Sequence, residues 1–208
     1  MPDTPDNVLP QGLFARHDES ADSDFYREPR FVTHIDDATI AALTEFYRTF
    51  IPDDADVVDL MSSWISHLPS EKPYGRVAGL GMNAAELAAN PQLSDFSVHD
   101  LNADPALPYN ADAFDRATIA VSIQYLTRPV EVFKSLGMTL RPGAQICIAM
   151  SHRLFPTKAI AAFQRLPPAE RVRLVITYLE LSGFADVEFI DRSPEGADPL
   201  WLVVGTRG

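Results

Sequence analysis

Residues 57–69, VVDLMSSWISHLP, hold the side chains in this sequence that are best suited to chemistry. Asp59 lies in an apolar run, and Ser62, Ser63, Trp64 and His67 follow it closely. A carboxylate accepts hydrogen bonds, a hydroxyl both donates and accepts them, and an imidazole moves a proton near neutral pH. The stretch therefore indicates a turn that binds a small polar ligand, although Trp64 on its own is more typical of packing.

Other polar segments also follow short apolar runs. They are GLGMNA with Gly81, Met82 and Asn83, HDLNAD with Asp100, Leu101 and Asn102, VSIQYL with Ser122, Gln124 and Tyr125, and SHRLFPTK with His152, Arg153 and Lys158. Near the N-terminus, FYREPRFVTHID adds Tyr26, Arg30 and His34. A fold that gathers these segments at one place would assemble a ligand site.

The elements between these segments predict such a fold. Strands are expected at residues 56–61, 76–80, 96–100, 115–122, 144–150, 186–191 and 200–206, and helices at 83–90, 129–140, 156–166 and 168–183. Strands that alternate with helices predict an α/β fold with a doubly wound, mostly parallel seven-stranded sheet. The last two strands have only a short polar link between them, which favours an antiparallel hairpin at one sheet edge. Ligands of such sheets bind beyond the carboxyl ends of the strands.

The chain before the first strand differs in character. Residues 1–30 are polar and turn-rich, which predicts a tail and an entry segment rather than a core element. Residues 36–51 space apolar side chains three and four apart behind Asp36 and Asp37, so an amphipathic helix is expected there, ending at Pro52. The expected organisation is an N-terminal tail and cap helix over residues 1–50, followed by one domain over residues 51–208.

Composition limits the partners. The chain of 208 residues has 17 basic and 29 acidic side chains, a net charge of −12, which repels phosphate backbones and anionic lipid surfaces. A small molecule is thus expected as partner, and neither nucleic acid nor a membrane. No secretory signal is visible, and no apolar run approaches the roughly 20 residues that span a bilayer. A cytoplasmic monomer or homodimer is expected, without a metal ion and with one structural cysteine, Cys147.

The order of these segments resembles the class I S-adenosylmethionine-dependent methyltransferases, especially the small-molecule group called type 11. In that family the third strand ends in an acid, an LPF-like turn precedes an FD pair before strand four, and LRPGG precedes strand five. This chain has HDLN, LPY, AFD and LRPGA at the matching places, within residues 55–150. The resemblance implies a Rossmann-like methyltransferase fold, S-adenosylmethionine as cofactor and methyl transfer to a small molecule.

The resemblance also implies roles for single residues. Asp100 would accept a hydrogen bond from the adenine amine, the Leu101 amide would meet a ring nitrogen, and Asp59 would order the turn around the methionine part. Ser122 and Gln124 would lie near the amino acid and methyl groups. The expected cofactor-binding set is Asp59, Ser62, Ser63, Gly81, Met82, Asn83, Asp100, Leu101, Asn102, Ser122 and Gln124. The alternative for Asp59 and Asp100 is a turn acid that caps a helix.

Two departures from the family pattern bear on the cofactor. The family's first turn reads DLGCGTG, whereas this chain has DLMSSWI, so Met61 and Trp64 narrow the usual path. Gly81 stands where the family commonly has an acid that binds both ribose hydroxyls. These changes indicate a rebuilt site held by Ser62, Ser63 and Asn83 with adenine against Met82, a relic that binds nothing, or a different ligand. The retained polar character of the turn favours the rebuilt site.

Methyl transfer needs alignment and at most one base, so candidates for chemistry are few. We expect His34, Tyr125 and His152 as catalytic candidates. Substrate contacts are expected from Tyr26, Arg30, Trp64, His67 and Arg153. The basic residues of SHRLFPTK suit an anionic substrate group, or equally a structural role at helix ends and surface acids.

Two other functions remain open at this stage. One is a non-catalytic binding or interaction protein that uses the same fold. The other is a nicotinamide or flavin protein, because GLGMNA matches the G-x-G-x-x-A form of the dinucleotide fingerprint and Asp100 follows at about the expected distance. Against the latter, this strand would be the second of the sheet rather than the first.

Overall fold

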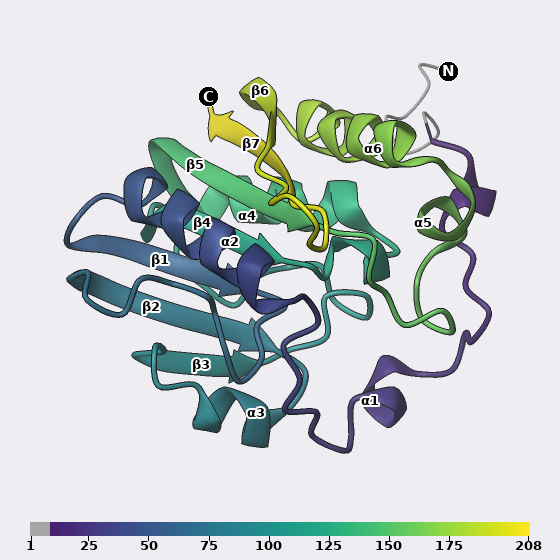
Figure 1. Cartoon of the computed structure of the whole chain (residues 1–208), viewed down its shortest axis with the longest axis horizontal. Helices are drawn as coiled ribbons and strands as arrows, with labels where there is room; N and C mark the ends of the chain where they lie inside the picture. Colours follow the sequence, from purple (N-terminus) through teal and green to yellow (C-terminus); the bar gives the residue numbers. More distant parts are fainter. Residues whose placement is uncertain (1–8) are drawn as a thin grey trace.

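The computed structural model describes residues 9–208 and contains one seven-stranded sheet in the order β3-β2-β1-β4-β5-β7-β6. Strands β3, β2, β1, β4 and β5 are parallel, while β7 runs antiparallel to both β5 and β6. The strands are β1 (Ala55–Leu60), β2 (Tyr74–Gly81), β3 (Asp95–Val98), β4 (Phe114–Ala120), β5 (Leu140–Met150), β6 (Phe184–Asp191) and β7 (Trp201–Arg207). The predicted α/β sheet and its antiparallel edge hairpin are confirmed (Figure 1).

Six α-helices accompany the sheet in the described residues. They are α1 (Asp22–Phe25), α2 (Asp37–Phe50), α3 (Ala84–Ala89), α4 (Pro129–Thr139), α5 (Ala161–Arg165) and α6 (Pro168–Leu181), with short 3-10 turns at η2 (Gln11–Leu13) and η3 (Ile123–Tyr125). The helix expected over residues 156–166 is wrong in its first half, where the chain turns before α5 begins. None of the described helices is long and apolar enough to cross a membrane.

Helix α2 covers one face of the sheet, as its sequence pattern predicts. Asp36 caps the helix, because its side chain accepts a hydrogen bond from the Thr39 amide. Leu43 and Tyr47 are fully buried in the apolar cluster that includes Val57 of β1. In Figure 1 the helix lies in front of the strands. Its burial fixes the chain that leads into β1.

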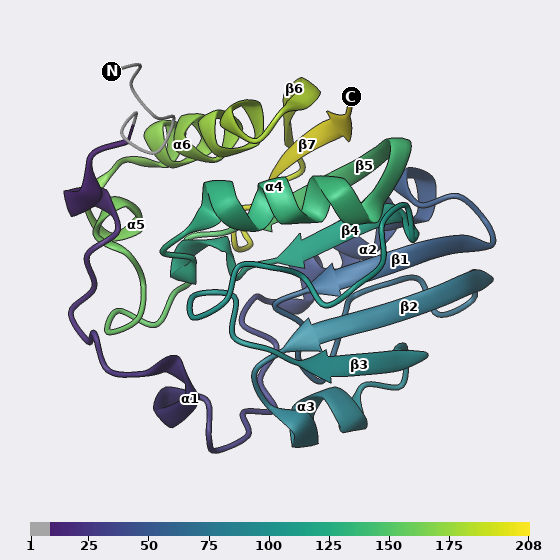
Figure 2. The ribbon, with the colours of Figure 1, turned by 180° about the vertical axis from the view of Figure 1, so that it is seen from behind.

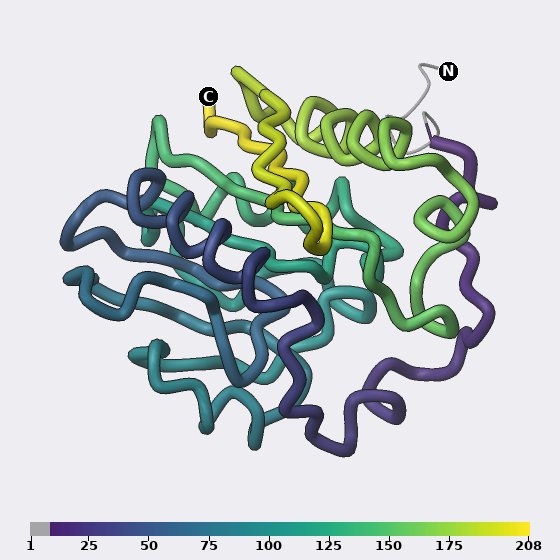
Figure 3. Tube along the Cα trace, viewed as in Figure 1, coloured from purple at the N-terminus to yellow at the C-terminus, as the bar shows by residue number. Residues whose placement is uncertain are grey.

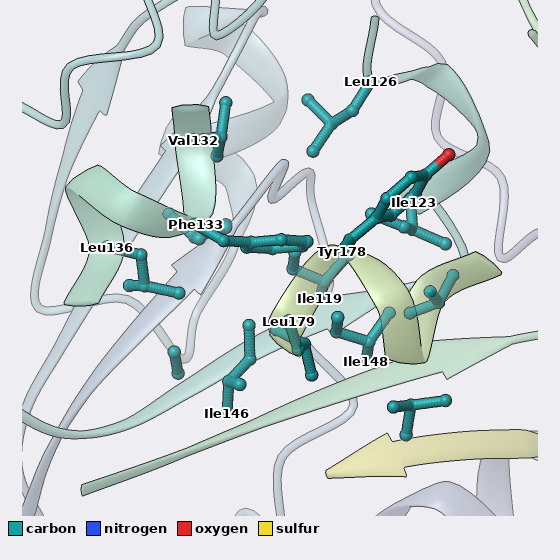
Figure 4. Close-up of a cluster of buried hydrophobic side chains, with 14 of the residues drawn as sticks. Ile119, Ile123, Leu126, Val132, Phe133, Leu136, Ile146, Ile148, Tyr178 and Leu179 are labelled. Carbon is teal, nitrogen blue, oxygen red and sulfur yellow. The ribbon is translucent and has the colours of Figure 1, made fainter. Parts of the chain in front are cut away.

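The opposite face packs against α4 and α6. Ile119 of β4 and Ile148 of β5 meet Phe133 of α4 and Tyr178 of α6 in the larger apolar cluster (Figure 4). Figure 2 shows α4 across this face. Because both faces of β4 and β5 are covered, the buried residues of both strands are mostly apolar, as expected of parallel strands. This packing makes the carboxyl ends of the central strands a rigid base for a site.

Two connections between parallel strands carry no helix. Residues 61–73 link β1 to β2, and residues 99–113 link β3 to β4, both as irregular chain. A crossover between parallel strands usually contains a helix, so the first link is unusual. Within it, Met61 and His67 adopt left-handed backbone conformations, with φ of 54° and 57°. The sequence-based pattern gave no helix there, yet it did not predict how the link is held.

Residues 16–35, called the strap below, cross the side of the sheet toward which the arrows of β1, β2 and β3 point in Figure 1, and Figure 3 shows the same course as a tube. Arg16 pairs with buried Asp22 at 2.7 Å, and Lys158 approaches the same carboxylate at 3.3 Å. Lys158 is only 1% exposed and also donates to the Ser20 carbonyl. The strap follows the predicted tail as an entry segment outside the core, and buried charges hold it, while residues 1–8 of the expected tail lie outside the described residues. Lys158 therefore holds the strap in place rather than lining the pocket.

Candidate functional site

A pocket with about 1080 Å³ of empty space, its open mouth included, lies at the carboxyl edge of the sheet. Its walls come from the ends of β1 to β4 and from the strap. Strand β1 lies between β2 and β4, where the strand order reverses, which is the usual ligand position in open α/β sheets. The pocket gathers most of the predicted residues: Tyr26, Arg30, His34, Asp59, Ser62, Ser63, His67, Gly81, Met82, Asn83, Asp100, Leu101, Asn102, Ser122 and Tyr125.

Asp59 organises the turn after β1. Its side chain is 2% exposed, and its oxygens accept hydrogen bonds from Ser62 at 2.6 Å, Ser66 at 2.7 Å and Thr118 at 2.9 Å. Burial raises the pKa of Asp59, and these three hydroxyl hydrogen bonds oppose the rise. Asn90 extends the network, since its amide donates to the Ser66 hydroxyl and the Ser63 carbonyl. The serines therefore fix the shape of the turn.

The turn lies against the end of β2. The Ser62 amide donates to the Leu80 carbonyl at 2.8 Å. A Cβ atom on Gly81 would overlap the Ser62 carbonyl oxygen, so only glycine fits at this position. The turn occupies the space that a side chain at position 81 would need, so no acidic side chain can stand at this end of β2.

Of the two bulky residues of the turn, Met61 lines the pocket and Trp64 does not. Met61 packs partly against the larger apolar cluster in a backbone conformation that favours glycine. Trp64 points to the strap, where its indole N–H donates to the Val32 carbonyl at 2.9 Å and its ring meets Phe31 edge to face. Trp64 does not line the pocket. The expected narrowing by Trp64 is therefore wrong.

Glu86 is a pocket residue that the sequence analysis missed. It lies in the first turn of α3, and its oxygens accept hydrogen bonds from the Arg30 amide at 2.7 Å and the Ser63 hydroxyl at 2.6 Å. It stands three residues after Asn83, the N-cap of α3, a spacing typical of a capping box, so the sequence alone suggests a purely local role. Instead it joins the turn, the helix and the strap.

The loop after β3 presents Asp100 to the pocket. One carboxylate oxygen accepts from the Asn102 and Ala103 amides at 2.9 and 3.3 Å, which shapes the loop. The second oxygen has no hydrogen-bond donor among residues 9–208. Asn102 is fully used elsewhere: it donates to Asp22 and the Tyr125 carbonyl and accepts from Thr127. Asp100 is therefore the acceptor on this loop that remains for a ligand.

The end of β4 carries strain and an unused hydroxyl. Val121 has φ of 44°, which is rare for a β-branched residue, and its amide donates to the Ala149 carbonyl. Next to it, the Ser122 hydroxyl is buried without a hydrogen-bond partner among the described residues. Tyr125 stacks on Phe155 and accepts from the Phe155 amide at 2.8 Å. Strain of this kind is often found at functional sites.

Two histidines in the pocket are kept neutral by burial. Burial lowers the pKa of His67 to about 4, with a smaller effect from His34. Burial also lowers the pKa of His34, partly opposed by the negative charge of Glu86. The Nδ1 atom of His67 is buried and unpartnered in the described part of the chain. Both rings are hydrogen-bonding groups rather than cations at neutral pH.

Three predicted residues besides Trp64 lie outside the pocket walls. Gln124 is buried and donates to the Val121 and Arg153 carbonyls, so it holds the chain after β4. His152 and Arg153 point instead to Asp198, at 3.2 and 3.0 Å. Their carboxylate partner, in the link before β7, was not apparent in the sequence. In this arrangement the three side chains contact other parts of the chain and lie outside the pocket walls.

The glycines of GLGMNA also have structural roles. A Cβ atom on Gly79 would overlap the Leu93 side chain, just as one on Gly81 would overlap the turn. Neither glycine opens a space for a pyrophosphate, which is what the dinucleotide fingerprint requires. Among residues 9–208, no group of three or more His, Cys, Asp or Glu side chains is placed to hold a metal ion.

No protein-family model matches the sequence, and no curated protein sequence matches it significantly. Solved structures do resemble it. An S-adenosylmethionine-dependent methyltransferase from Mesorhizobium loti is 18% identical, with a TM-score of 0.57 over 80% of this chain and 98% of the other. The [4+2]-cyclase SpnF is 14% identical, with a TM-score of 0.60 over 79% and 80%. Geranyl diphosphate C-methyltransferase from Streptomyces coelicolor A3(2) is 12% identical, with a TM-score of 0.58 over 81% and 77%.

The chain has the class I methyltransferase fold. Within this fold it departs from the pattern of the resemblance at the turn after β1 and at Gly81, where the turn leaves no room for a side chain. The turn after β1 has serines bound to Asp59 in place of glycines, and it continues into an irregular link instead of a helix. The strap, held by buried charges and by Asn83, forms a wall of the pocket.

The groups in the pocket fit the nucleoside end of S-adenosylmethionine. Asp100 offers a free acceptor for an adenine amine, and Met82 and Leu101 add apolar side chains to the lining of the same pocket. At the other end, the Ser122 hydroxyl is an unused hydrogen-bonding group. The residues missed by the sequence analysis, among them Asp22, Glu86 and Phe155, complete the pocket from α1, α3 and the link after β5.

Proposed function

We propose that this chain is an S-adenosylmethionine-dependent methyltransferase that acts on a small molecule. The observation that carries the proposal is a pocket at the reversal of strand order with one uncommitted carboxylate oxygen, on Asp100, where a base would lie. The bound cofactor would supply an electrophilic methyl group. A net charge of −12 disfavours a nucleic acid as the methyl acceptor and supports a small molecule.

The residues of the chain would bind and orient both molecules. Asp100 and Leu101 hold the adenine, and Asp59 keeps the turn in place through Ser62 and Ser66. On the strap side, Tyr26, Arg30 and His34 cover the pocket. His34 and His67 are neutral, so either ring can accept a hydrogen bond from a hydroxyl or amine of the methyl acceptor.

The test of this proposal is Asp100→Asn. Asparagine keeps an oxygen for the Asn102 and Ala103 amides, so the loop is retained, but it presents N–H groups to the adenine amine. We expect S-adenosylhomocysteine to bind about 1 to 3 kcal/mol more weakly by calorimetry. An analogue without the 6-amino group should bind the wild type about as weakly as S-adenosylhomocysteine binds the variant. Its affinity for the variant should be no lower than its affinity for the wild type.

Asp104→Asn is the matched control, because Asp104 lies exposed on the same loop and outside the pocket. It should bind S-adenosylhomocysteine as the wild type does. If the wild type binds neither S-adenosylmethionine nor S-adenosylhomocysteine at millimolar concentration, the proposal is wrong. If Asp100→Asn has unchanged affinity, Asp100 does not hold the adenine.

A second candidate is a binding protein of the same fold without catalysis. It is favoured by one observation, the commitment of Asp59, Ser62 and Ser63 to internal hydrogen bonds in the turn that would face the methionine part. The two candidates differ in turnover. Wild-type protein that binds S-adenosylmethionine but releases no S-adenosylhomocysteine with any small-molecule fraction tested would support the second.

A further inference from the structure

Glu86 is the unusual charge of this pocket. It is 7% exposed, yet no lysine, arginine or histidine among residues 9–208 forms an ion pair with it. Its two hydrogen bonds come from a backbone amide and a hydroxyl. Asp22, equally buried in the same pocket, has Arg16 and Lys158. A buried carboxylate is costly unless polar hydrogens surround it, so Glu86 lacks partners that its neighbour has.

The unused capacity of Glu86 is considerable. A carboxylate has about four lone-pair sites, and the Arg30 amide and the Ser63 hydroxyl use two of them. The residue lines the pocket, so further donors can reach it only from a ligand or water. The chemistry that fits is a pair of adjacent hydroxyl groups, which could meet the two oxygens while the existing hydrogen bonds persist.

The order of the strands indicates which part of a ligand would lie beside Glu86. Along the pocket edge the sequence is β3, β2, β1, β4, with Asp100 after β3 and Ser122 after β4. Neighbouring strands are about 4.8 Å apart, so these ends are separated by about 14 Å. A nucleoside whose base meets Asp100 and whose reacting end approaches Ser122 must lay its sugar across the ends of β2 and β1. Glu86 and its partner Ser63 stand at that place.

The end of β2 cannot itself supply the acceptor, because a side chain at Gly81 would overlap the Ser62 carbonyl. An acceptor for the sugar must then come from a neighbouring element. Glu86, five residues later in α3, is the pocket-lining carboxylate nearest in sequence to that strand end.

We propose that the Glu86 carboxylate binds the two ribose hydroxyls of the cofactor, in place of a residue at the strand end. This inference rests on the proposed function and adds to it a residue that selects ribose over deoxyribose. Ser63 and the Arg30 amide orient the carboxylate for this contact, so the strap and the turn both contribute to recognition of the sugar.

The test compares Glu86→Gln with the wild type by calorimetry, using S-adenosylhomocysteine and its 2′,3′-dideoxy analogue. Glutamine can accept from the Arg30 amide and donate to the Ser63 hydroxyl, so the internal contacts can be kept. We expect the variant to bind S-adenosylhomocysteine roughly tenfold to a hundredfold more weakly. The wild type should lose a similar factor with the dideoxy analogue, and the variant should lose little more.

Glu131→Gln is the matched control, since Glu131 is also a first-turn glutamate, on α4, and pairs with Arg128 away from the pocket. It should bind both ligands as the wild type does. Should Glu86→Gln fold poorly, Glu86→Asp replaces it, and the affinities of Glu86→Asp and of the wild type for the two ligands are compared in the same way. Two results would overturn the role of Glu86. One is that the variant binds both ligands more weakly than the wild type by the same factor, and the other is that the variant binds S-adenosylhomocysteine as tightly as the wild type. Absence of any binding to the wild type would overturn the proposed function as well.

Discussion

At the scale of residues, the contact between Ser62 and Gly81 decides how the site is built. The Ser62 peptide donates to the Leu80 carbonyl, and its own carbonyl lies where a side chain at 81 would begin. The hydroxyl of Ser62 in the turn donates to Asp59, and the end of β2 can hold only glycine at position 81. The backbone of the turn therefore leaves no room for a side chain at the end of the neighbouring strand β2.

We predict that Gly81→Ala lowers the free energy of unfolding by about 1 to 3 kcal/mol, the usual cost of an added methyl group in a packed region. The methyl must displace the Ser62 carbonyl or the Leu87 side chain, both of which lie against this position. Urea titration measures the change. Restoring an acid there, Gly81→Asp, should destabilise further and should not improve cofactor binding.

Gly137→Ala provides the comparison, because Gly137 lies inside α4 and a Cβ there would meet only Phe184 at 4.0 Å. This change should stabilise the protein by about 0.5 to 1 kcal/mol. An unfolding free energy for Gly81→Ala equal to or above that of the wild type would show that the turn does not press on β2 as described.

At the scale of elements, Asn83 links α3 to the strap. Its side-chain oxygen accepts from the Ala85 and Glu86 amides as an N-cap, and its amide group donates to the Tyr26 and Arg27 carbonyls. One side chain therefore starts a helix and holds the cover of the pocket. A substitution can remove the donor function of this side chain and keep its acceptor function.

We predict that Asn83→Asp keeps α3 and releases the strap. Aspartate is an equally good N-cap, but it cannot donate to the Tyr26 and Arg27 carbonyls and repels them. Hydrogen exchange should rise in residues 25–34 while α3 keeps its protection. In Asn83→Ala both regions should exchange faster, with about 1 kcal/mol lost from the helix. Unchanged exchange in residues 25–34 of Asn83→Asp would mean that other contacts hold the strap.

The elements of the fold were largely predictable, and the strap was not. Apolar runs and helical spacing locate the strands, α2, α4 and α6 to within a few residues, because burial against neighbours requires those patterns. The start of α5 was missed since residues 156–160 form a turn despite their helical composition. The strap carries no periodic pattern. It is fixed by the pair of Arg16 with Asp22 and by Lys158, which lies more than a hundred residues away in the sequence.

The site shows the same division. Asp100 and Ser122 could be found because they follow strands, whose ends converge by topology. Glu86 and Asp22 could not, because their importance comes from contacts between distant segments that no local pattern records. Glu86 joins α3 to the strap and the turn, and Asp22 joins the strap to Asn102 and Lys158. His152 and Arg153 have suitable chemistry and suitable sequence position, but Asp198 draws both away.

At the scale of the whole molecule, the buried titratable groups set how stability depends on pH. His67 is 5% exposed, and burial lowers its pKa from 6.5 to about 4. Its contribution to stability is complete above pH 6.5 and is lost as the pH falls toward 4, because the unfolded chain takes up a proton that the folded chain refuses. The shift is worth about 3 kcal/mol at 1.36 kcal/mol per unit.

We predict that His67→Asn removes this part of the acid sensitivity. Asparagine tolerates the left-handed backbone of residue 67, where φ is 57°, and does not titrate. Between pH 7 and 4, the unfolding free energy of the wild type should fall by about 3 kcal/mol more than that of the variant. Exposed His17 is the control, and His17→Asn should follow the wild type. Parallel curves for wild type and His67→Asn would contradict the burial of a neutral ring.

The irregular link of residues 61–73 has a consequence for how this protein can diversify. A helix moves as one body when a residue on it changes, because its backbone groups bind one another. Here separate side chains hold separate points: Asn90 the Ser63 carbonyl, Gln92 the Leu68 carbonyl and Thr44 the His67 carbonyl. Each point can be altered alone, so a substitution can change one part of the pocket lining while the sheet beneath it stays as it is.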